Sequence, residues 1–192
     1  VLDQLGCPLG IVHFIAAPTD IHVSVYGKQS HAGATPMNLR EDALAAAAEM
    51  ILEIEKLAKS YQNVSTVATV GKLDICSNSS NVIPGEVHFT IDIRSNDFEE
   101  KQRILLALQH MYQEIEMRRH VRIEAAVLCN EKPALADEKM MQLMKTAAQE
   151  YGLQYHDMGS GAYHDAMMIS EFAPFGMIFV PSKAGISHSR RS

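Results

Sequence analysis

The sequence has few cysteines and few basic residues. Its three cysteines, Cys7, Cys76 and Cys129, are far apart and form no Cys-x-x-Cys pair. We therefore expect neither a disulfide framework nor a cysteine zinc site. We expect a reducing, cytoplasmic location instead. Seventeen lysines and arginines stand against 23 aspartates and glutamates, which gives a net charge of −6. A chain this acidic lacks the clustered cations that release counterions from a phosphate backbone, so no nucleic-acid partner is expected.

Long hydrophobic runs and common catalytic motifs are absent as well. No apolar run approaches the ~18–20 residues of a membrane-spanning helix, so no membrane partner is expected. The N-terminal VLDQLGCPLG shows no basic leader, so no signal peptide is expected. The missing initiating Met suggests an excerpt of a longer protein. No H-E-x-x-H, H-x-D, Walker, G-x-G-x-x-G or G-x-S-x-G motif occurs. The 47% apolar content predicts a globular core, and the nine histidines are the compositional feature left to explain.

Hydrophobic periodicity predicts a β-α-β-β-α-β unit from residue 20 to 128. Apolar residues alternate with polar ones in three predicted strands and recur every three or four residues in two predicted helices. Another strand is rich in Val, Thr and Ile, with Gly71 as a candidate bulge. The strands are 21–26, 64–76, 87–94 and 121–127, and the helices follow the candidate N-caps Asn38 and Asn96. This order predicts a ferredoxin-like fold, a four-stranded antiparallel sheet with both helices on one face.

The segments on either side of this unit have a different pattern. Residues 137–151 indicate a helix closed by Gly152, and 175–180 (FGMIFV) indicate a strand buried on both faces. Residues 1–19 and 130–192 make no convincing domain of their own. The chain is therefore predicted to be α/β (α+β), with the ferredoxin-like unit inserted into, or cut from, a second α/β domain.

Three polar residues of the ferredoxin-like unit are candidates for a site, each with an ordinary alternative. His31 lies in SHAGATPM, where small neighbours leave the imidazole accessible; the alternative is a solvated loop histidine. Arg94 could aim its planar fork at a substrate carboxylate, or it could pair in water with Asp92 or Glu99. Asn81 in SNVIPG is ambiguous because Asn is common in turns.

Two histidines are candidates in the C-terminal part. His164 follows a Gly-Ser-Gly turn near a helix start, where an imidazole and backbone N–H groups could stabilise an oxyanion. The alternative makes Asp165 a helix-start charge and His164 a bystander. His188 lies in a loop after a predicted buried strand, where open α/β sheets build sites. One histidine cannot hold a catalytic metal, which needs about three or more protein ligands.

Four segments together resemble a known family. SHAGATPMNLREDAL, SNVIPGEVHFTIDIRS, MGSGAYHDA and GMIFVPSKAGISHS are similar, in order and spacing, to the dinuclear-metal amidohydrolases that include allantoate amidohydrolase, N-carbamoyl-L-amino-acid hydrolase and beta-ureidopropionase. These belong to the clan of zinc aminoacylases and carboxypeptidases. The resemblance implies an end of an N-terminal catalytic segment (1–19), a ferredoxin-like lid and dimerisation domain (20–129), and a C-terminal part of the catalytic α/β domain (130–192).

The resemblance also implies roles for the lid residues. His31 and Asn81 would bind the ureido or amide group of the substrate and stabilise developing negative charge, with His31 as the catalytic residue. Arg94 would hold the substrate carboxylate. Such lid residues often reach the substrate of the partner subunit, so the implied partners are a second copy of the chain, in a homodimer, and a small carboxylate-bearing ureide.

In the C-terminal part, the backbone at Gly161 would line the substrate and His164 would close its pocket. His188 would ligate one of two bridged divalent ions, zinc or manganese. The family's H-x-D pair, its adjacent acidic pair with the general-base Glu and a further ligand would lie before Val1. The 192-residue chain alone is therefore expected to hold no metal stably and to be inactive.

The sequence is consistent with two functions. The first is a portion of a metal-dependent amidohydrolase that cleaves a C–N bond of an N-carbamoyl amino acid or an allantoate-like ureide, with an aminoacylase or dipeptidase as a close variant. The second is a non-catalytic ferredoxin-like module for dimerisation or ligand binding.

Overall fold

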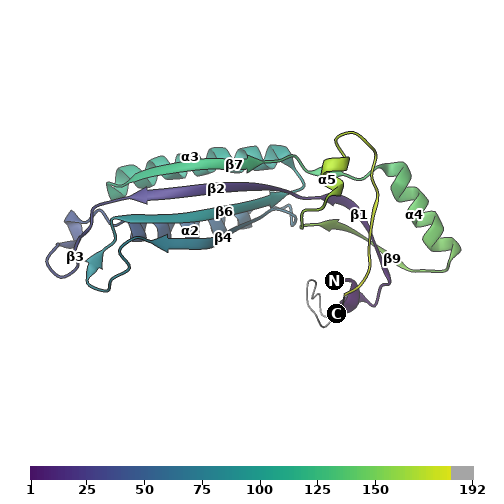
Figure 1. The fold of residues 1–192 in the computed structure, drawn as a ribbon, viewed down its shortest axis with the longest axis horizontal. Coiled ribbons are helices and arrows are strands. Elements are labelled where there is room, and N and C mark those ends of the chain that lie inside the picture. Colours follow the sequence, from purple (N-terminus) through teal and green to yellow (C-terminus); the bar gives the residue numbers. More distant parts are fainter. Residues whose placement is uncertain (183–192) are drawn as a thin grey trace. The chain divides into compact units, whose positions relative to one another are not determined.

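The computed structural model describes residues 1–182 and divides into two compact units (Figure 1). Unit 1 combines Val1–Ala17 with Lys132–Ser192, and unit 2 is Pro18–Glu131. Each unit has its own sheet and its own cluster of buried hydrophobic residues.

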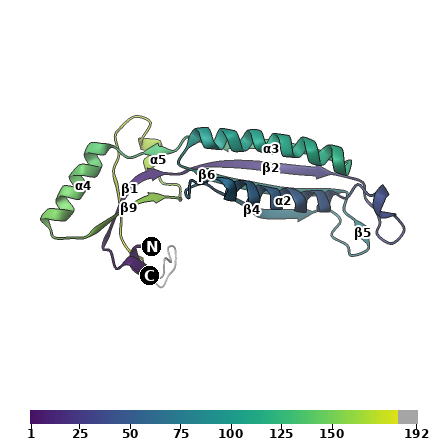
Figure 2. The ribbon, with the colours of Figure 1, turned by 180° about the vertical axis from the view of Figure 1, so that it is seen from behind.

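Unit 2 is a four-stranded sheet with two helices on one face. The strand order is β4-β6-β2-β7, and the β2–β7 and β4–β6 pairs are antiparallel. The strands lie in front of α2 and α3 in Figure 1, whereas Figure 2, from behind, shows the helices in front. The predicted ferredoxin-like arrangement is confirmed. Its elements are β2 (Ala17–Tyr26), α2 (Ala43–Ser60), β4 (Val67–Ile75), β6 (Glu86–Ser95), α3 (Phe98–Arg119) and β7 (Arg122–Asn130).

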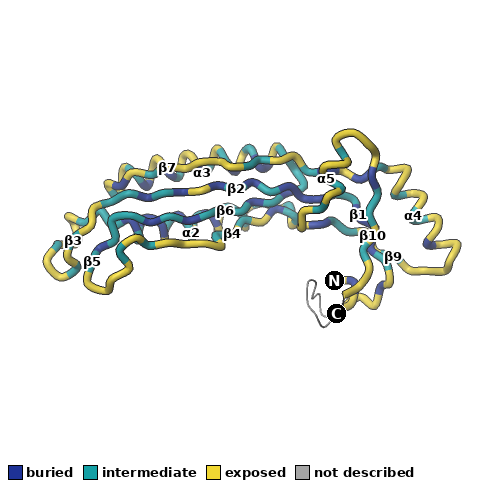
Figure 3. The backbone as a smooth tube through the Cα atoms, in the orientation of Figure 1, coloured by how far each residue is buried: buried dark blue, intermediate teal, exposed yellow. Residues whose placement is uncertain are grey.

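The alternation seen in the sequence builds the core of unit 2. Every second residue of β6 is buried, and the same pattern runs through β2. Small residues on α2 bring that helix close to the sheet, and each fully buried large side chain stabilises the fold by about 1.5–3 kcal/mol. The outer strands β4 and β7 are mostly exposed (Figure 3). The core comprises Ile21, Val23, Val25, Ala43, Ala46, Ala47, Met50, Ile54, Val87, Phe89, Ile91, Ile93, Ile104, Leu108, Tyr112, Ile115 and Val121.

Both predicted helix caps were wrong in position. Asp42, not Asn38, caps α2, since its carboxylate accepts from the N–H groups of Leu44 and Ala45, both at 2.9 Å. Asp97, not Asn96, caps α3. In both cases a carboxylate just before the first helical turn replaces the expected amide, which suits the positive end of the helix dipole. The predicted bulge at Gly71 is confirmed by the register shift between Val70 and Lys72.

Two short paired segments extend from one end of the sheet of unit 2. β3 (Ser30–His31) pairs antiparallel with β5 (Val82–Ile83), and η1 (Met37–Leu39) follows β3. Backbone hydrogen bonds hold their bases together, among them Gly27 N–H to Gly85 O at 2.8 Å. A Cβ on Gly27 would lie 2.0 Å from the carbonyl oxygen of Glu41, so only glycine fits at this crossing.

Unit 1 is built around one central strand. β9 pairs with β1 in parallel, while β10 and β8 pair antiparallel with successive parts of β1. The prediction that residues 175–180 form a strand buried on both faces was wrong. The described strand is shorter, and Ile178 is 47% exposed, so only part of this apolar run is buried. The elements are α1 (Leu2–Leu5), β1 (Leu9–Ile15), β8 (Ala134–Leu135), α4 (Glu138–Glu150), β9 (Tyr155–Ser160), α5 (Ala166–Ile169) and β10 (Met177–Phe179).

Candidate functional site

The pairing of β3 with β5 brings two predicted site residues together. His31 lies opposite Val82 in the register, and the N–H of Ala32 donates to the carbonyl oxygen of Asn81 at 2.9 Å. Both His31 and Asn81 are exposed. They are therefore neighbours although they lie far apart in the sequence. The end of unit 2 that β3 and β5 form is called the tip.

Local hydrogen bonds give both side chains a defined polarity. The His31 Nδ1 accepts from the N–H groups of Gly33 at 3.0 Å and Ala34 at 3.2 Å, so the neutral ring carries its proton on Nε2. The Asn81 Oδ1 accepts from the Ser79 hydroxyl at 3.0 Å, which leaves the amide NH₂ as the donor end. The tip thus presents two N–H donors, an arrangement that suits an oxygen carrying negative charge.

The loop after His31 is held in shape by Arg40. Its Nε donates to the Thr35 carbonyl at 3.1 Å, and its Nη2 donates to the Ala32 carbonyl at 2.6 Å. The sequence prediction for SHAGATPM considered only the small residues beside His31 and did not include Arg40. Nothing in the local sequence around Arg40 indicates which carbonyls its side chain would reach.

Arg94 does not join His31 and Asn81 within one chain. It lies eight residues along β6 from Glu86, and β6 begins beside the tip, so about 26 Å of extended strand separates Arg94 from the tip. Its guanidinium forms a two-point ion pair with Asp92, with Nε–Oδ1 at 2.9 Å and Nη2–Oδ2 at 3.0 Å. Hydrogen bonding to Asp92 raises the pKa of Arg94. The ordinary alternative, pairing with Asp92, is thus present in the structure.

His164 and Gly161 line a cavity of about 680 Å³ in unit 1. The Nε2 of His164 lies 2.9 Å from the Ser160 hydroxyl, and its ring packs against Phe179 with ring centroids 5.4 Å apart. Ser160 is 2% exposed, and its hydroxyl also donates to the Ala162 carbonyl at 3.0 Å. Ser160 is therefore a buried anchor for the imidazole, a role that the sequence did not reveal even though the Gly-Ser-Gly turn marked the place.

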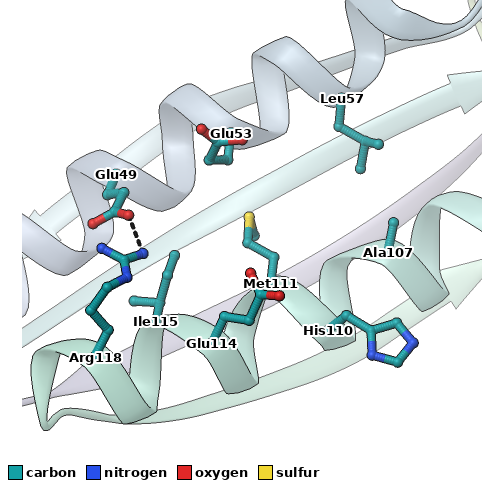
Figure 4. Close-up of a pocket in the computed structure, with 9 residues that line it drawn as sticks. All are labelled: Glu49, Glu53, Leu57, Ala107, His110, Met111, Glu114, Ile115 and Arg118. Atoms are coloured by element: carbon teal, nitrogen blue, oxygen red, sulfur yellow. Dashed lines mark hydrogen bonds and ion pairs between the residues drawn. The ribbon is translucent and has the colours of Figure 1, made fainter.

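A second cavity, of about 580 Å³, lies between α2 and α3 (Figure 4). Figure 4 shows Glu49, Glu53 and Glu114 along its walls, with Glu49 paired to Arg118. Arg119 also pairs with Glu49, and hydrogen bonding to Arg118 lowers the pKa of Glu49. These ion pairs join the two helices at one end of the groove.

Comparison with known proteins gives the ancestry of the chain. Residues 19–119, more than half of its length, match the family model described as "Peptidase dimerisation domain". The chain belongs to this peptidase dimerisation domain family. It is 38% identical over 189 residues to "N-carbamoyl-L-amino acid amidohydrolase" of Geobacillus stearothermophilus, covering 98% of this chain and 46% of that protein. It is 36% identical over 189 residues to "Ureidoglycolate hydrolase" of Oryza sativa subsp. japonica, covering 98% of this chain and 39% of that protein.

A solved structure of the same family shares the fold. The hydantoinase/carbamoylase family amidase of Burkholderia multivorans superposes with a TM-score of 0.91 at 31% identity, covering 98% of this chain and 46% of that one. The resemblance to this group of amidohydrolases is therefore confirmed, and the chain spans less than half the length of these relatives. No helix in the described part of the chain combines the length and apolar character needed to cross a membrane.

The described residues do not fit the pair of metal ions that the resemblance implies. His188, the predicted ligand, lies outside the described residues. Among residues 1–182, one group of three potential ligands lies close enough to share an ion, Cys76, Glu86 and His88, and it belongs to unit 2. The imidazole of His164 in unit 1 has a serine hydroxyl as its neighbour. The described part of unit 1 therefore brings together no ligand set for a metal-dependent step.

Proposed function

We propose that the chain is part of a hydrolase that cleaves a C–N bond of a ureide bearing a carboxylate, an N-carbamoyl amino acid or an allantoate-like compound. The observation that carries this proposal is the position of His31 next to Asn81 at the tip of unit 2, where His31 lies opposite Val82 and the Ala32 N–H donates to the Asn81 carbonyl. Those two residues belong to the segments that resemble the amidohydrolases, and relatives at 36–38% identity are named for such reactions.

The tip is chemically suited to a ureido carbonyl. Attack of a nucleophile on this carbonyl places negative charge on its oxygen. The Nε2–H of His31 and the amide of Asn81 would both donate to that oxygen, and donors held in place before the reaction lower its barrier most effectively. The Gly33 and Ala34 N–H groups fix the His31 tautomer that makes this possible.

Arg94 would recognise the carboxylate of the substrate, with Asp92 fixing the plane of its guanidinium. The about 26 Å of strand between Arg94 and the tip is too long for one small ureide to bridge. We infer that His31 and Asn81 of one copy act together with Arg94 of a second copy. A homodimer formed through the dimerisation domain would supply both.

The 192-residue chain by itself would dimerise and contact substrate without turning it over. The described residues bring together no set of ligands in unit 1 for the two ions that the family is expected to use. Those ions, zinc or manganese, would be held by the complete enzyme, with His188 as one ligand contributed by this chain.

Substrate class is tested by assaying the complete enzyme against N-carbamoyl amino acids, N-acyl amino acids, dipeptides and ureides. We expect turnover of N-carbamoyl or ureide substrates, with His31→Ala and Asn81→Ala each lowering kcat by about 10²–10³-fold. His110→Ala, an exposed histidine of α3, is the matched control and should leave kcat unchanged. Preference for N-acyl substrates or dipeptides would instead assign an aminoacylase or dipeptidase.

The two-copy site is tested by mixing inactive variants. Dimers that pair a His31→Ala copy with an Arg94→Ala copy hold one intact site and one doubly altered site. Random mixing in a symmetric dimer should therefore restore about a quarter of wild-type activity. No recovery after confirmed subunit exchange would place all three residues in one copy and reject the arrangement.

A further inference from the structure

The turn between β4 and β6 collects three potential metal ligands. Cys76 follows β4 directly, and Glu86 and His88 lie two residues apart at the start of β6. Val87, between them, belongs to the core, so Glu86 and His88 project from the opposite face of the sheet. The N–H of Cys76 donates to the Glu86 carbonyl at 3.2 Å, which places the cysteine across from the glutamate.

The side chains of these residues converge. One ligand atom of each, the Cys76 Sγ, a Glu86 carboxylate oxygen and a His88 ring nitrogen, lies within 4.8 Å of the other two. The His88 Nε2 is 3.0 Å from the Glu86 Oε1. Zinc ligated by such groups has bonds of about 2.0–2.3 Å, so small side-chain rotations would bring all three onto one ion.

The imidazole is already oriented by a neighbouring strand. The His88 Nδ1 lies 2.8 Å from the Ser24 hydroxyl of β2, and the Tyr26 ring meets the imidazole edge-on at 6.3 Å between centroids. Metal-binding histidines commonly donate their second ring N–H to such a partner, which fixes the ring and directs the other nitrogen to the ion. Ser24 supplies this support for Nε2.

The chemistry of the three ligands indicates which ion would bind. Thiolate, imidazole and carboxylate together are typical of Zn²⁺ and of ions that replace it, whereas Mg²⁺ and Ca²⁺ require oxygen ligands.

We propose that Cys76, Glu86 and His88 form a three-ligand site for a zinc-like transition metal on the sheet of unit 2, with solvent completing the coordination. The spacing of the cysteines predicted no cysteine zinc site, because no two of the three cysteines lie close together in the sequence. The hairpin instead gives one cysteine two partners of other kinds. The proposal is independent of the hydrolase function, because none of these residues is assigned there.

Cobalt titration of the full 192-residue chain tests the site. We expect one equivalent of Co²⁺ to give a near-ultraviolet thiolate-to-cobalt charge-transfer band, which Zn²⁺ then abolishes. Cys76→Ser should remove the band and His88→Gln should weaken binding strongly. Cys129→Ser and His188→Ala are the matched controls and should retain the band.

Two further measurements distinguish the loss of a metal ligand from a change in folding. Ser24→Ala should keep the charge-transfer band but weaken cobalt affinity about 10-fold or more, since it removes only the orienting hydroxyl. Zn²⁺ should raise the thermal unfolding midpoint of the wild-type chain and not that of Cys76→Ser. A band that persists in Cys76→Ser, disappears in His188→Ala, or never forms in the wild-type chain would overturn the site.

Discussion

Lys101 is a fully buried lysine whose charge is held by backbone carbonyls. Its Nζ donates to the carbonyl oxygens of Pro18 at 3.0 Å and Glu131 at 2.7 Å. These are the first and last residues of unit 2, and the N–H of Glu131 also donates to Pro18 at 3.2 Å. Lys101 thus fastens the two ends of the unit. In the polar run NDFEEKQR nothing marks this lysine as buried.

The buried ammonium predicts an unusual pH dependence of stability. Burial lowers the pKa of Lys101 to about 8 from an ordinary value of 10.5. Between these values the unfolded chain binds more protons than the folded one, so the free energy of unfolding should rise from pH 8 toward 10, by up to about 2–3 kcal/mol. Urea unfolding at pH 7.5 and 9.5 measures this change.

Lys101→Met is the control for the pH experiment. It removes the titrating group, so its unfolding free energy should change less between the two pH values than that of the wild-type chain. Measurements stay below pH 10, because burial raises the pKa of Tyr112 and ionisation of that phenol in the unfolded chain would lower stability at higher pH. Equal slopes in the two proteins would contradict the assignment to Lys101.

At the scale of elements, the start of α2 shows why a local pattern misplaced a cap. Asn38 and Glu41 match the spacing of a capping box, yet the Glu41 carbonyl accepts from the Lys28 N–H at 2.8 Å and the Ala43 N–H donates to the Pro84 carbonyl at 3.1 Å. These contacts with distant segments hold Glu41 and Asp42 outside the helix. The helix therefore begins at Ala43, with Asp42 as its cap.

This cap can be tested by paired substitutions. Asp42→Ala should lower the free energy of unfolding by about 1 kcal/mol, because two N–H groups of the first turn lose their acceptor. Asn38→Ala should change it by no more than about 0.5 kcal/mol, as is usual for surface positions. Chemical denaturation of both variants gives the comparison, and a larger effect at Asn38 would return the cap to the sequence-predicted position.

Substitution by alanine should destabilise unit 2 at Gly27 and should be tolerated at Gly71. Gly27→Ala places a Cβ 2.0 Å from the Glu41 carbonyl, so we expect a loss of about 1–3 kcal/mol in unfolding free energy and a disturbed His31 tip. Gly71→Ala meets no atom within 4 Å and should be tolerated. Thermal unfolding reports the stability, and the chemical shift of the His31 ring reports the tip.

At the scale of the whole molecule, unit 2 has what an independent domain needs. In the part of the chain that the structure describes, its four strands pair with one another and with no other strand, and its core is one continuous cluster drawn from the sheet and both helices. We expect residues 18–131 expressed alone to unfold cooperatively. Calorimetric and van't Hoff enthalpies that agree would support this, and a non-cooperative transition would show that unit 2 depends on unit 1.

Dimerisation is the second expectation at this scale. The match to a peptidase dimerisation domain covers residues 19–119, and the outer strands of the sheet expose apolar side chains such as Val67 and Val127. Light scattering of the full chain should give the mass of a dimer, and His188→Ala should not change it. A monomer at high concentration would contradict both this expectation and the two-copy site.

The sequence by itself determined the ferredoxin-like fold, because alternation of period two fixes which face of a strand is buried and helical spacing fixes which stripe packs on it. These patterns are local in the sequence and do not depend on which distant segments the chain contacts. The family followed from the four segments that resemble the amidohydrolases. The sequence also marked His31, Asn81 and Arg94 as candidates, through segments that resemble the amidohydrolases.

Only the tertiary structure decided which of these residues lie next to one another. It placed His31 beside Asn81 and left Arg94 far along β6 with Asp92, it set Cys76 against Glu86 and His88, and it buried Lys101. The physical reason is that register and burial depend on pairing between segments distant in sequence, and a shift of one residue in register would have sent each of these strand residues to the opposite face.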